Sequence, residues 1–161
     1  MGAAWINDVS GFENPAMLAA VKDSDCKLVL MHALGVPADT RIHLPESVDA
    51  VKVLLDYAHT RIGYMEKEGI ARSRIVFDPG IGFGKTPAQS RNILSRLAEL
   101  KEAGLALYVG HSRKSFLGLP ANAGNGARDD ATLAVSKKLM EQGVDYLRVH
   151  DIARHVELRH G

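Results

Sequence analysis

Side chains that could bind a polar ligand follow or close several apolar segments of this chain. The apolar segments cover residues 4–6, 28–31, 75–77, 105–109 and 146–149. The polar residues at their carboxyl ends are Asn7, Asp8, His32, Asp78, His111, Ser112, Arg113, Lys114, Arg148, His150 and Asp151. In parallel α/β folds the carboxyl ends of all strands lie on one side, where ligands bind. If the apolar segments are parallel strands, these polar side chains share one site.

Arg148 and His150 form a candidate anion site. They lie two residues apart at the end of an apolar segment, so in a strand both side chains project from the same face. A planar guanidinium beside an imidazole suits the oxygens of a phosphate or pyrophosphate. The alternative is a salt bridge between Arg148 and Asp151.

A second candidate for anion binding is the Ser-Arg-Lys-Ser segment at residues 112–115. If a short helix starts there, its N–H groups and hydroxyls favour a negatively charged ligand group. The alternative for Arg113 and Lys114 is a solvated position on the surface.

The glycine-rich segment 78–86 invites comparison with a nucleotide-binding P-loop. That motif requires G-x-x-x-x-G-K-[ST] between a strand and a helix. Pro79 stands where the first glycine is needed, and Gly80 comes one residue too late. We therefore expect the glycines to allow a sharp turn or a close approach of the backbone to a flat ligand. The alternative is a connection without a ligand, closed by a capped helix.

Helix signals occur between the apolar segments. Asn14-Pro15 and Thr86-Pro87 each place a capping residue before a proline at the first helical position, and Thr86 with Gln89 forms a capping box. The expected helices cover residues 16–21, about 47–68, 86–104, 130–143 and a stretch after residue 151, and residues 121–129 are expected to form an irregular loop. Strands that alternate with helices predict an α/β fold with parallel strands, either doubly wound or a (β/α)8 barrel. Trp5, Phe77 and Tyr108 fall inside strands and are expected in the core.

Composition narrows the class of protein. The 161 residues include 20 Lys+Arg and 19 Asp+Glu, a net charge of +1, which argues against a nucleic-acid-binding or polybasic membrane-binding protein. The hydrophobic and charged fractions are typical of one globular domain. The single cysteine excludes an intrachain disulfide framework and a cysteine-based zinc site. Residues 1–5 have neither the basic region nor the apolar region of a signal peptide, and no apolar run is long enough to span a bilayer, so cytoplasm is the expected location.

Several of these segments, taken in order, resemble the dihydropteroate synthase family. The segments are residues 7–11 (NDVSG), 31–32 (MH), 78–86 (DPGIGFGKT), 112–116 (SRKSF) and 148–151 (RVHD). Such an ordered set is far more specific than any single motif, and the resemblance covers essentially the whole chain. Residues 33–40 depart from the commonest family pattern, which indicates a divergent branch.

The resemblance implies a (β/α)8 barrel and a transferase of folate biosynthesis. The family condenses 6-hydroxymethyl-7,8-dihydropterin diphosphate with p-aminobenzoate and releases pyrophosphate. By position, the pterin-binding residues are Asn7, Val9, Met31, Asp78, Phe83, Gly110 and Lys114. The p-aminobenzoate-binding residues are Arg113 and Ser115. The catalytic residues are Lys114, Arg148 and His150, of which the last two bind the diphosphate. The resemblance also implies Mg2+, with no metal ligand among these residues, and a homodimer.

The length is too short for a complete barrel. A (β/α)8 barrel usually takes about 250 residues, and this chain of 161 contains five predicted βα units. By its motifs the chain resembles the last five units, as a single partial domain over residues 1–161 that lacks the first three, including the expected metal ligand. Two alternatives stay open: a pterin-binding domain like the methyltetrahydrofolate:corrinoid methyltransferases, and a non-catalytic pterin-binding fragment. Residues 112–115 with the Arg148 and His150 pair favour the synthase.

Overall fold

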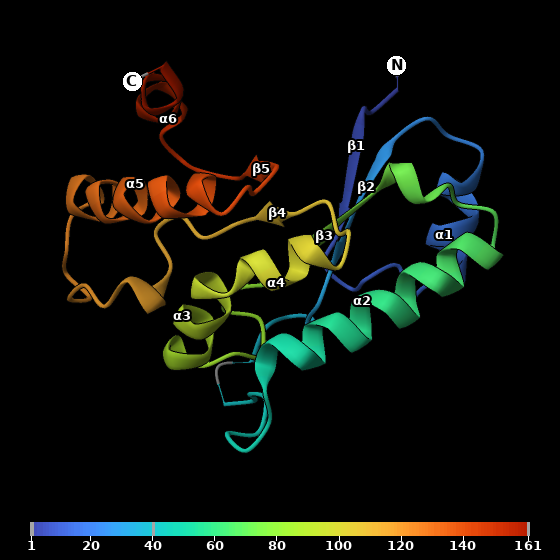
Figure 1. The fold of residues 1–161 in the computed structure, drawn as a ribbon, viewed down its shortest axis with the longest axis horizontal. Helices are drawn as coiled ribbons and strands as arrows, with labels where there is room; N and C mark the ends of the chain where they lie inside the picture. Colours follow the sequence, from blue (N-terminus) through green and yellow to red (C-terminus); the bar gives the residue numbers. More distant parts are fainter. Residues whose placement is uncertain (1, 40, 161) are drawn as a thin grey trace.

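The computed structural model describes residues 2–39 and 41–160 as strands that alternate with helices (Figure 1). The strands in this part of the chain are β1 (Trp5–Asp8), β2 (Lys27–Met31), β3 (Ile75–Asp78), β4 (Tyr108–Val109) and β5 (Tyr146–Leu147). The α-helices are α1 (Pro15–Lys22), α2 (Ala50–Lys67), α3 (Pro87–Ser95), α4 (Leu97–Glu102), α5 (Asn125–Glu141) and α6 (Ile152–His160). Two short 3-10 helices, η1 (Arg72–Arg74) and η2 (Ser115–Leu117), precede β3 and follow β4.

All strand pairs are parallel, and the strands follow one another in chain order. β1, β2 and β3 form one sheet, and β4 pairs with β5. The two groups meet where the Phe77 N–H donates to the Ala106 carbonyl at 2.8 Å, beside a parallel bridge between Phe77 and Leu107. This confirms the expected α/β fold with parallel strands. β4 and β5 are each only two residues long, shorter than the apolar segments that predicted them.

The two faces of the strands have different partners. Leu28 and Leu30 of β2 and Phe77 of β3 belong to the core that the strands share with the helices. Val29, between the two leucines, and Val76, directly before Phe77, are buried on the opposite face, because successive side chains of a strand point to opposite faces. Helices α2 to α4 line one side of the strands, and both chain ends lie on the other (Figure 1). The second face is the inner one in a barrel.

Two predicted helices differ from the observed ones. The segment 86–104 begins with the expected capping box, but it breaks at Arg96, where φ is −122°. Arg96 there forms ion pairs with Asp49 at 2.8 Å and with Glu99 at 2.6 Å. The segment 121–129 is not wholly irregular, because α5 begins at Asn125 and includes Asp129.

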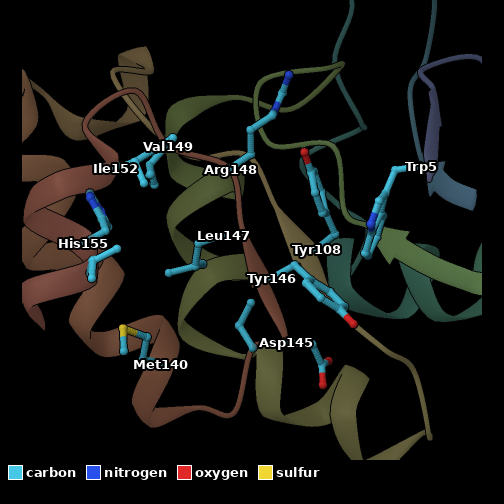
Figure 2. A pocket seen from close by; sticks show the side chains of 12 residues that line it. Trp5, Tyr108, Met140, Asp145, Tyr146, Leu147, Arg148, Val149, Ile152 and His155 are labelled. Carbon is cyan, nitrogen blue, oxygen red and sulfur yellow. The ribbon is translucent and has the colours of Figure 1, made fainter. Parts of the chain in front are cut away.

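The inner face is open between the first and the last strand. Trp5 of β1 is 39% exposed, and its ring meets that of Tyr146 of β5 edge to face, with centroids 4.8 Å apart. These rings border a groove of about 920 Å3 that continues along β5 to α6, as Figure 2 shows. The expectation that Trp5 lies in the core is wrong, because β1 is an edge strand and no described strand pairs with its free edge. No helix within the described residues is long and apolar enough to cross a membrane.

Candidate active site

Asp78 provides a buried carboxylate at the carboxyl end of β3. Its side chain is almost completely enclosed, with 2% of the residue exposed, and Oδ1 accepts a hydrogen bond from the Gly80 N–H at 2.7 Å. Burial raises the pKa of Asp78, whereas the hydrogen bond and the cations of Lys114, Arg148 and Lys85 act to lower it. A carboxylate that faces three cations is well placed to accept hydrogen bonds from a ligand.

Strand register brings the predicted residues of β1 and β2 to the same face as Asp78. Met31 is the direct partner of Asp78, and Asn7 is the partner of Val29, which points to the same side as Met31. Val9 follows β1 and is half-buried. The Asp8 carboxylate stabilises the turn after β1, because it accepts hydrogen bonds from the backbone N–H groups of Ser10 and Phe12.

The glycine-rich loop after β3 places an aromatic ring beside a lysine. Gly80 has a φ of +65°, and a Cβ at this position would lie 1.9 Å from the His32 carbonyl oxygen, so only glycine fits this approach of two loops. The ammonium of Lys114 lies 5.1 Å from the centre of the Phe83 ring and donates to the Ile81 carbonyl at 2.5 Å. Burial lowers the pKa of Lys114 to about 8. Phe83 and Lys114 therefore form an adjoining wall of the site.

Arg148 and His150 follow the carboxyl end of β5 and form a further part of the site. A Cβ on Gly110 would approach the Arg148 guanidinium to 2.8 Å, so the absence of a side chain at Gly110 makes room for Arg148. His150 Nδ1 lies 2.8 Å from the Ser112 hydroxyl, which orients the ring. Both residues are exposed, and among the described residues Arg148 forms no salt bridge with Asp151. The alternative interpretation of Arg148 is therefore wrong.

The segment 112–115 contains an ion-paired arginine, and a short 3-10 helix, η2, begins at its last residue. The Arg113 guanidinium binds the Asp129 carboxylate through two hydrogen bonds of 2.7 Å. Arg113 also adopts a left-handed φ of +59°, which is uncommon for a residue other than glycine. Ser115 begins η2 and is exposed. Arg113 is thus neither a solvated surface charge nor an unpaired cation.

Lys85 lies near the site but was not identified as a site residue from the sequence. Lys85 was considered only as the lysine of a rejected P-loop, yet its ammonium is buried against His32, 2.8 Å from Nδ1. No local pattern distinguishes such a lysine from an exposed one, because its partner lies 53 residues away in sequence. Among residues 2–39 and 41–160, no group of three or more His, Cys, Asp or Glu side chains could hold a metal ion. These residues alone do not fit a magnesium site, and no step below depends on one.

Known proteins similar to this chain include several dihydropteroate synthases. The dihydropteroate synthase type-1 of Escherichia coli is 38% identical over 157 residues, which cover 92% of this chain and 55% of that protein. The dihydropteroate synthase of Anaplasma phagocytophilum, solved with bound 6-hydroxymethylpterin-monophosphate, is 34% identical with a TM-score of 0.88 and covers 98% of this chain. The dihydropteroate synthase of Xanthomonas albilineans, solved with 7,8-dihydropteroate, is also 34% identical, with a TM-score of 0.84 over 98% of this chain.

These similarities explain the open side of the fold. This chain matches 63% of the Anaplasma phagocytophilum structure and 58% of the Xanthomonas albilineans structure, so it spans little more than half the length of its relatives. Its fold is part of the barrel of those enzymes. The family model described as pterin binding enzyme matches residues 1–150, almost the entire chain. The chain therefore belongs to the family of pterin binding enzymes.

Proposed function

We propose that this chain supplies the pterin- and diphosphate-binding part of a dihydropteroate synthase. Such a transferase joins p-aminobenzoate to 6-hydroxymethyl-7,8-dihydropterin diphosphate in folate biosynthesis. The observation that carries the proposal is the buried Asp78 carboxylate, which faces the cations of Lys114, Arg148 and Lys85. The structural similarity to a synthase with a bound pterin monophosphate supports a pterin as the ligand.

Asp78 and Lys114 anchor the pterin in this proposal. The Asp78 carboxylate accepts hydrogen bonds from the amino-pyrimidine edge, a paired contact that two carboxylate oxygens can make at once. Lys114 lies over Phe83 and donates to an acceptor of the pterin ring. The remaining residues that we assign to the pterin site are Asn7, Val9, Met31, Phe83 and Gly110.

Arg148 and His150 stabilise the leaving group. The C–O bond between the pterin CH2 and the diphosphate breaks, and the lone pair of the aniline nitrogen of p-aminobenzoate forms the new C–N bond. The nitrogen then releases its extra proton to solvent, and pyrophosphate departs with the electron pair of the broken bond. The guanidinium of Arg148 and the imidazole of His150 bind the charge that develops on the diphosphate, and Lys114 adds positive charge nearby. The enzyme needs no covalent nucleophile for this reaction.

The p-aminobenzoate is assigned to the segment around η2. Ser115 is exposed at the start of this short helix, where its hydroxyl can receive the carboxylate of p-aminobenzoate. Because Asp129 pairs with Arg113, we assign to Arg113 the task of holding in place the loop that receives this carboxylate.

The rest of the barrel completes the site in this proposal. We assign residues 1–161 to the last five βα units of an eight-unit barrel, so that three units outside this sequence pair with the free edges of β1 and β5. Those units also supply the ligand of the Mg2+ that the family resemblance implies. We further propose that the complete enzyme is a homodimer, as the same resemblance implies.

Titration with two ligands tests the proposed function. We expect the 161-residue chain to bind 6-hydroxymethylpterin diphosphate more tightly than methyltetrahydrofolate, because only the diphosphate engages Arg148 and His150. Isothermal titration calorimetry measures both affinities. Tighter binding of methyltetrahydrofolate would instead indicate a methyltransferase-like domain.

A second candidate function is pterin binding without catalysis. The open groove between β1 and β5 favours it, because the described residues leave this side of the site uncovered. Pyrophosphate release by this chain, when the missing barrel units are supplied, would rule this candidate out.

Arg148→Ala is expected to weaken pyrophosphate binding by about ten-fold, because it removes charge-assisted hydrogen bonds. Binding by the unmodified chain should also weaken as salt is added, since added ions screen exposed charges. Calorimetry with pyrophosphate measures both effects. Arg72→Ala is the matched control, because Arg72 is an exposed arginine in η1, before the amino end of β3. Equal affinities of the Arg148 and Arg72 variants would remove Arg148 from the anion site.

A further inference from the structure

Lys85 is a buried lysine that the reaction outlined above does not use. Only 4% of the residue is exposed, although lysine is almost never fully buried unless its charge is paired. Its ammonium lies 2.8 Å from His32 Nδ1, 3.0 Å from the His32 carbonyl oxygen and 3.0 Å from the Phe83 carbonyl oxygen. Lys85 therefore connects the end of β2 to the loop that carries Phe83.

The three contacts match the hydrogen-bonding capacity of a protonated lysine. An ammonium group has three N–H donors and no acceptor, so each of the three neighbouring atoms has to accept one hydrogen bond. His32 Nδ1 can accept only when it is unprotonated, which requires a neutral imidazole with its proton on Nε2. Burial and the charge of Lys85 lower the pKa of His32 to about 3, which is consistent with a neutral ring.

The same ammonium lies beside the turn that binds the carboxylate that we assign to the pterin: a Cβ on Gly80 would lie 3.2 Å from Lys85 Nζ, and the Gly80 N–H donates to Asp78 Oδ1 at 2.7 Å. Burial lowers the pKa of Lys85 to about 7, whereas Asp78 raises it and Lys114 lowers it further. Lys85 also affects Asp78. Burial raises the pKa of Asp78, whereas the positive charges of Lys85, Lys114 and Arg148 lower it. Lys85 differs from the other two cations because its three hydrogen bonds to the protein hold it in place.

We propose that Lys85 is a positioning residue of the pterin site. Its ammonium holds the loop of Phe83 against the end of β2 and, while it is protonated, supplies a positive charge that favours the ionised Asp78 carboxylate for the pterin. This role rests on the proposed function, because it concerns the same ligand. A methionine of similar length would fill the space but would provide neither the hydrogen bonds nor the charge.

The pH dependence of pterin binding separates the charge of Lys85 from a purely structural role. Pterin affinity falls as pH falls, because protonated Asp78 can no longer accept a pair of hydrogen bonds. In Lys85→Met the loss of the positive charge raises the pKa of Asp78, so the acid limb of the binding curve moves to higher pH, by about one pH unit. Calorimetric titrations of 6-hydroxymethylpterin from pH 5 to pH 9 measure this limb.

Lys52→Met is the matched control, because Lys52 is an exposed lysine that also pairs with an aspartate, Asp56. We expect this variant to keep the acid limb of the unmodified chain. A Lys85→Met curve that is weakened equally at every pH, with its acid limb unmoved, would overturn the proposed effect of the charge on Asp78. If the unmodified chain binds no pterin at any pH, the proposed function fails, a result distinct from an unmoved limb.

A measurement on the unmodified chain keeps the proposal testable if Lys85→Met does not fold. Nitrogen-15 NMR of the histidine rings reports which ring nitrogen of His32 carries the proton. We expect an unprotonated Nδ1 and a protonated Nε2 at pH 6, where the ammonium of Lys85 is present. A protonated Nδ1 would overturn the arrangement, because Lys85 could not donate to it.

Discussion

Asp78→Ala is expected to weaken the binding of 6-hydroxymethylpterin by about ten- to a hundred-fold. The substitution removes charge-assisted hydrogen bonds that contribute roughly 1.5–3 kcal/mol to binding. The substitution also leaves the Gly80 N–H without its acceptor, because buried Asp78 Oδ1 accepts that hydrogen bond at 2.7 Å. Isothermal titration calorimetry on the 161-residue chain measures the change in dissociation constant.

Two further variants define what the Asp78 result means. Asp78→Asn keeps the shape of the side chain but replaces one acceptor oxygen with a donor NH2, so we expect it to weaken pterin binding as well. Asp56→Ala removes an exposed carboxylate from α2 and should leave the affinity unchanged. Retention of full affinity by Asp78→Ala would exclude this carboxylate from the pterin site.

The 161-residue chain alone is expected to release pyrophosphate from the two substrates about a hundred-fold more slowly than a completed barrel, or not at all. Each group that stabilises the developing charge can contribute two to three orders of magnitude to the rate, and we assign such groups to the units outside this chain. The free edges of β1 and β5 and the exposed rings of Trp5 and Tyr146 also favour self-association. A coupled assay for pyrophosphate and size-exclusion chromatography measure the two effects.

A separate polypeptide that contains the three missing βα units should restore the activity. Its strands can pair with the free edges of β1 and β5, and its inward side chains can cover the groove beside Tyr146 (Figure 2). The control is a mixture with Arg148→Ala, which should associate equally well but release pyrophosphate more slowly. Full turnover by a monomer of this chain alone would show that our assignment of missing groups is wrong.

Local sequence patterns predicted much of the fold. The apolar segments at residues 28–31 and 75–77 became β2 and β3, because strands buried on both faces need continuous apolar residues. Asn14 and Thr86 cap the starts of α1 and α3, as predicted, because the side-chain oxygen of each accepts a hydrogen bond from a free backbone N–H of the first turn. These signals depend only on neighbouring residues, so they can be interpreted without the tertiary structure.

The sequence also predicted that Asp78 lies at the carboxyl end of a strand. It predicted that Asp78 and Arg148 belong to the same site, because the carboxyl ends of parallel strands lie on one side of the sheet. The role assigned to Lys114 came from the resemblance to a family and stays a prediction, although the structure places its ammonium over Phe83. The motifs alone did not reveal how Arg113 is used, because its partner Asp129 lies on a helix that begins later in the chain.

The tertiary structure decided the features that depend on distant residues. The ion pair at the helix break joins Arg96 to Asp49, which caps the start of another helix far away in sequence. Lys85 is buried because His32, directly after β2, supplies two acceptors for its N–H groups and the Phe83 carbonyl oxygen supplies the third. Trp5 is exposed because β1 is an edge strand, and no strand among the described residues pairs with its free edge. Propensity and capping act over a few residues, whereas burial and charge pairing depend on groups that only the folded chain brings together.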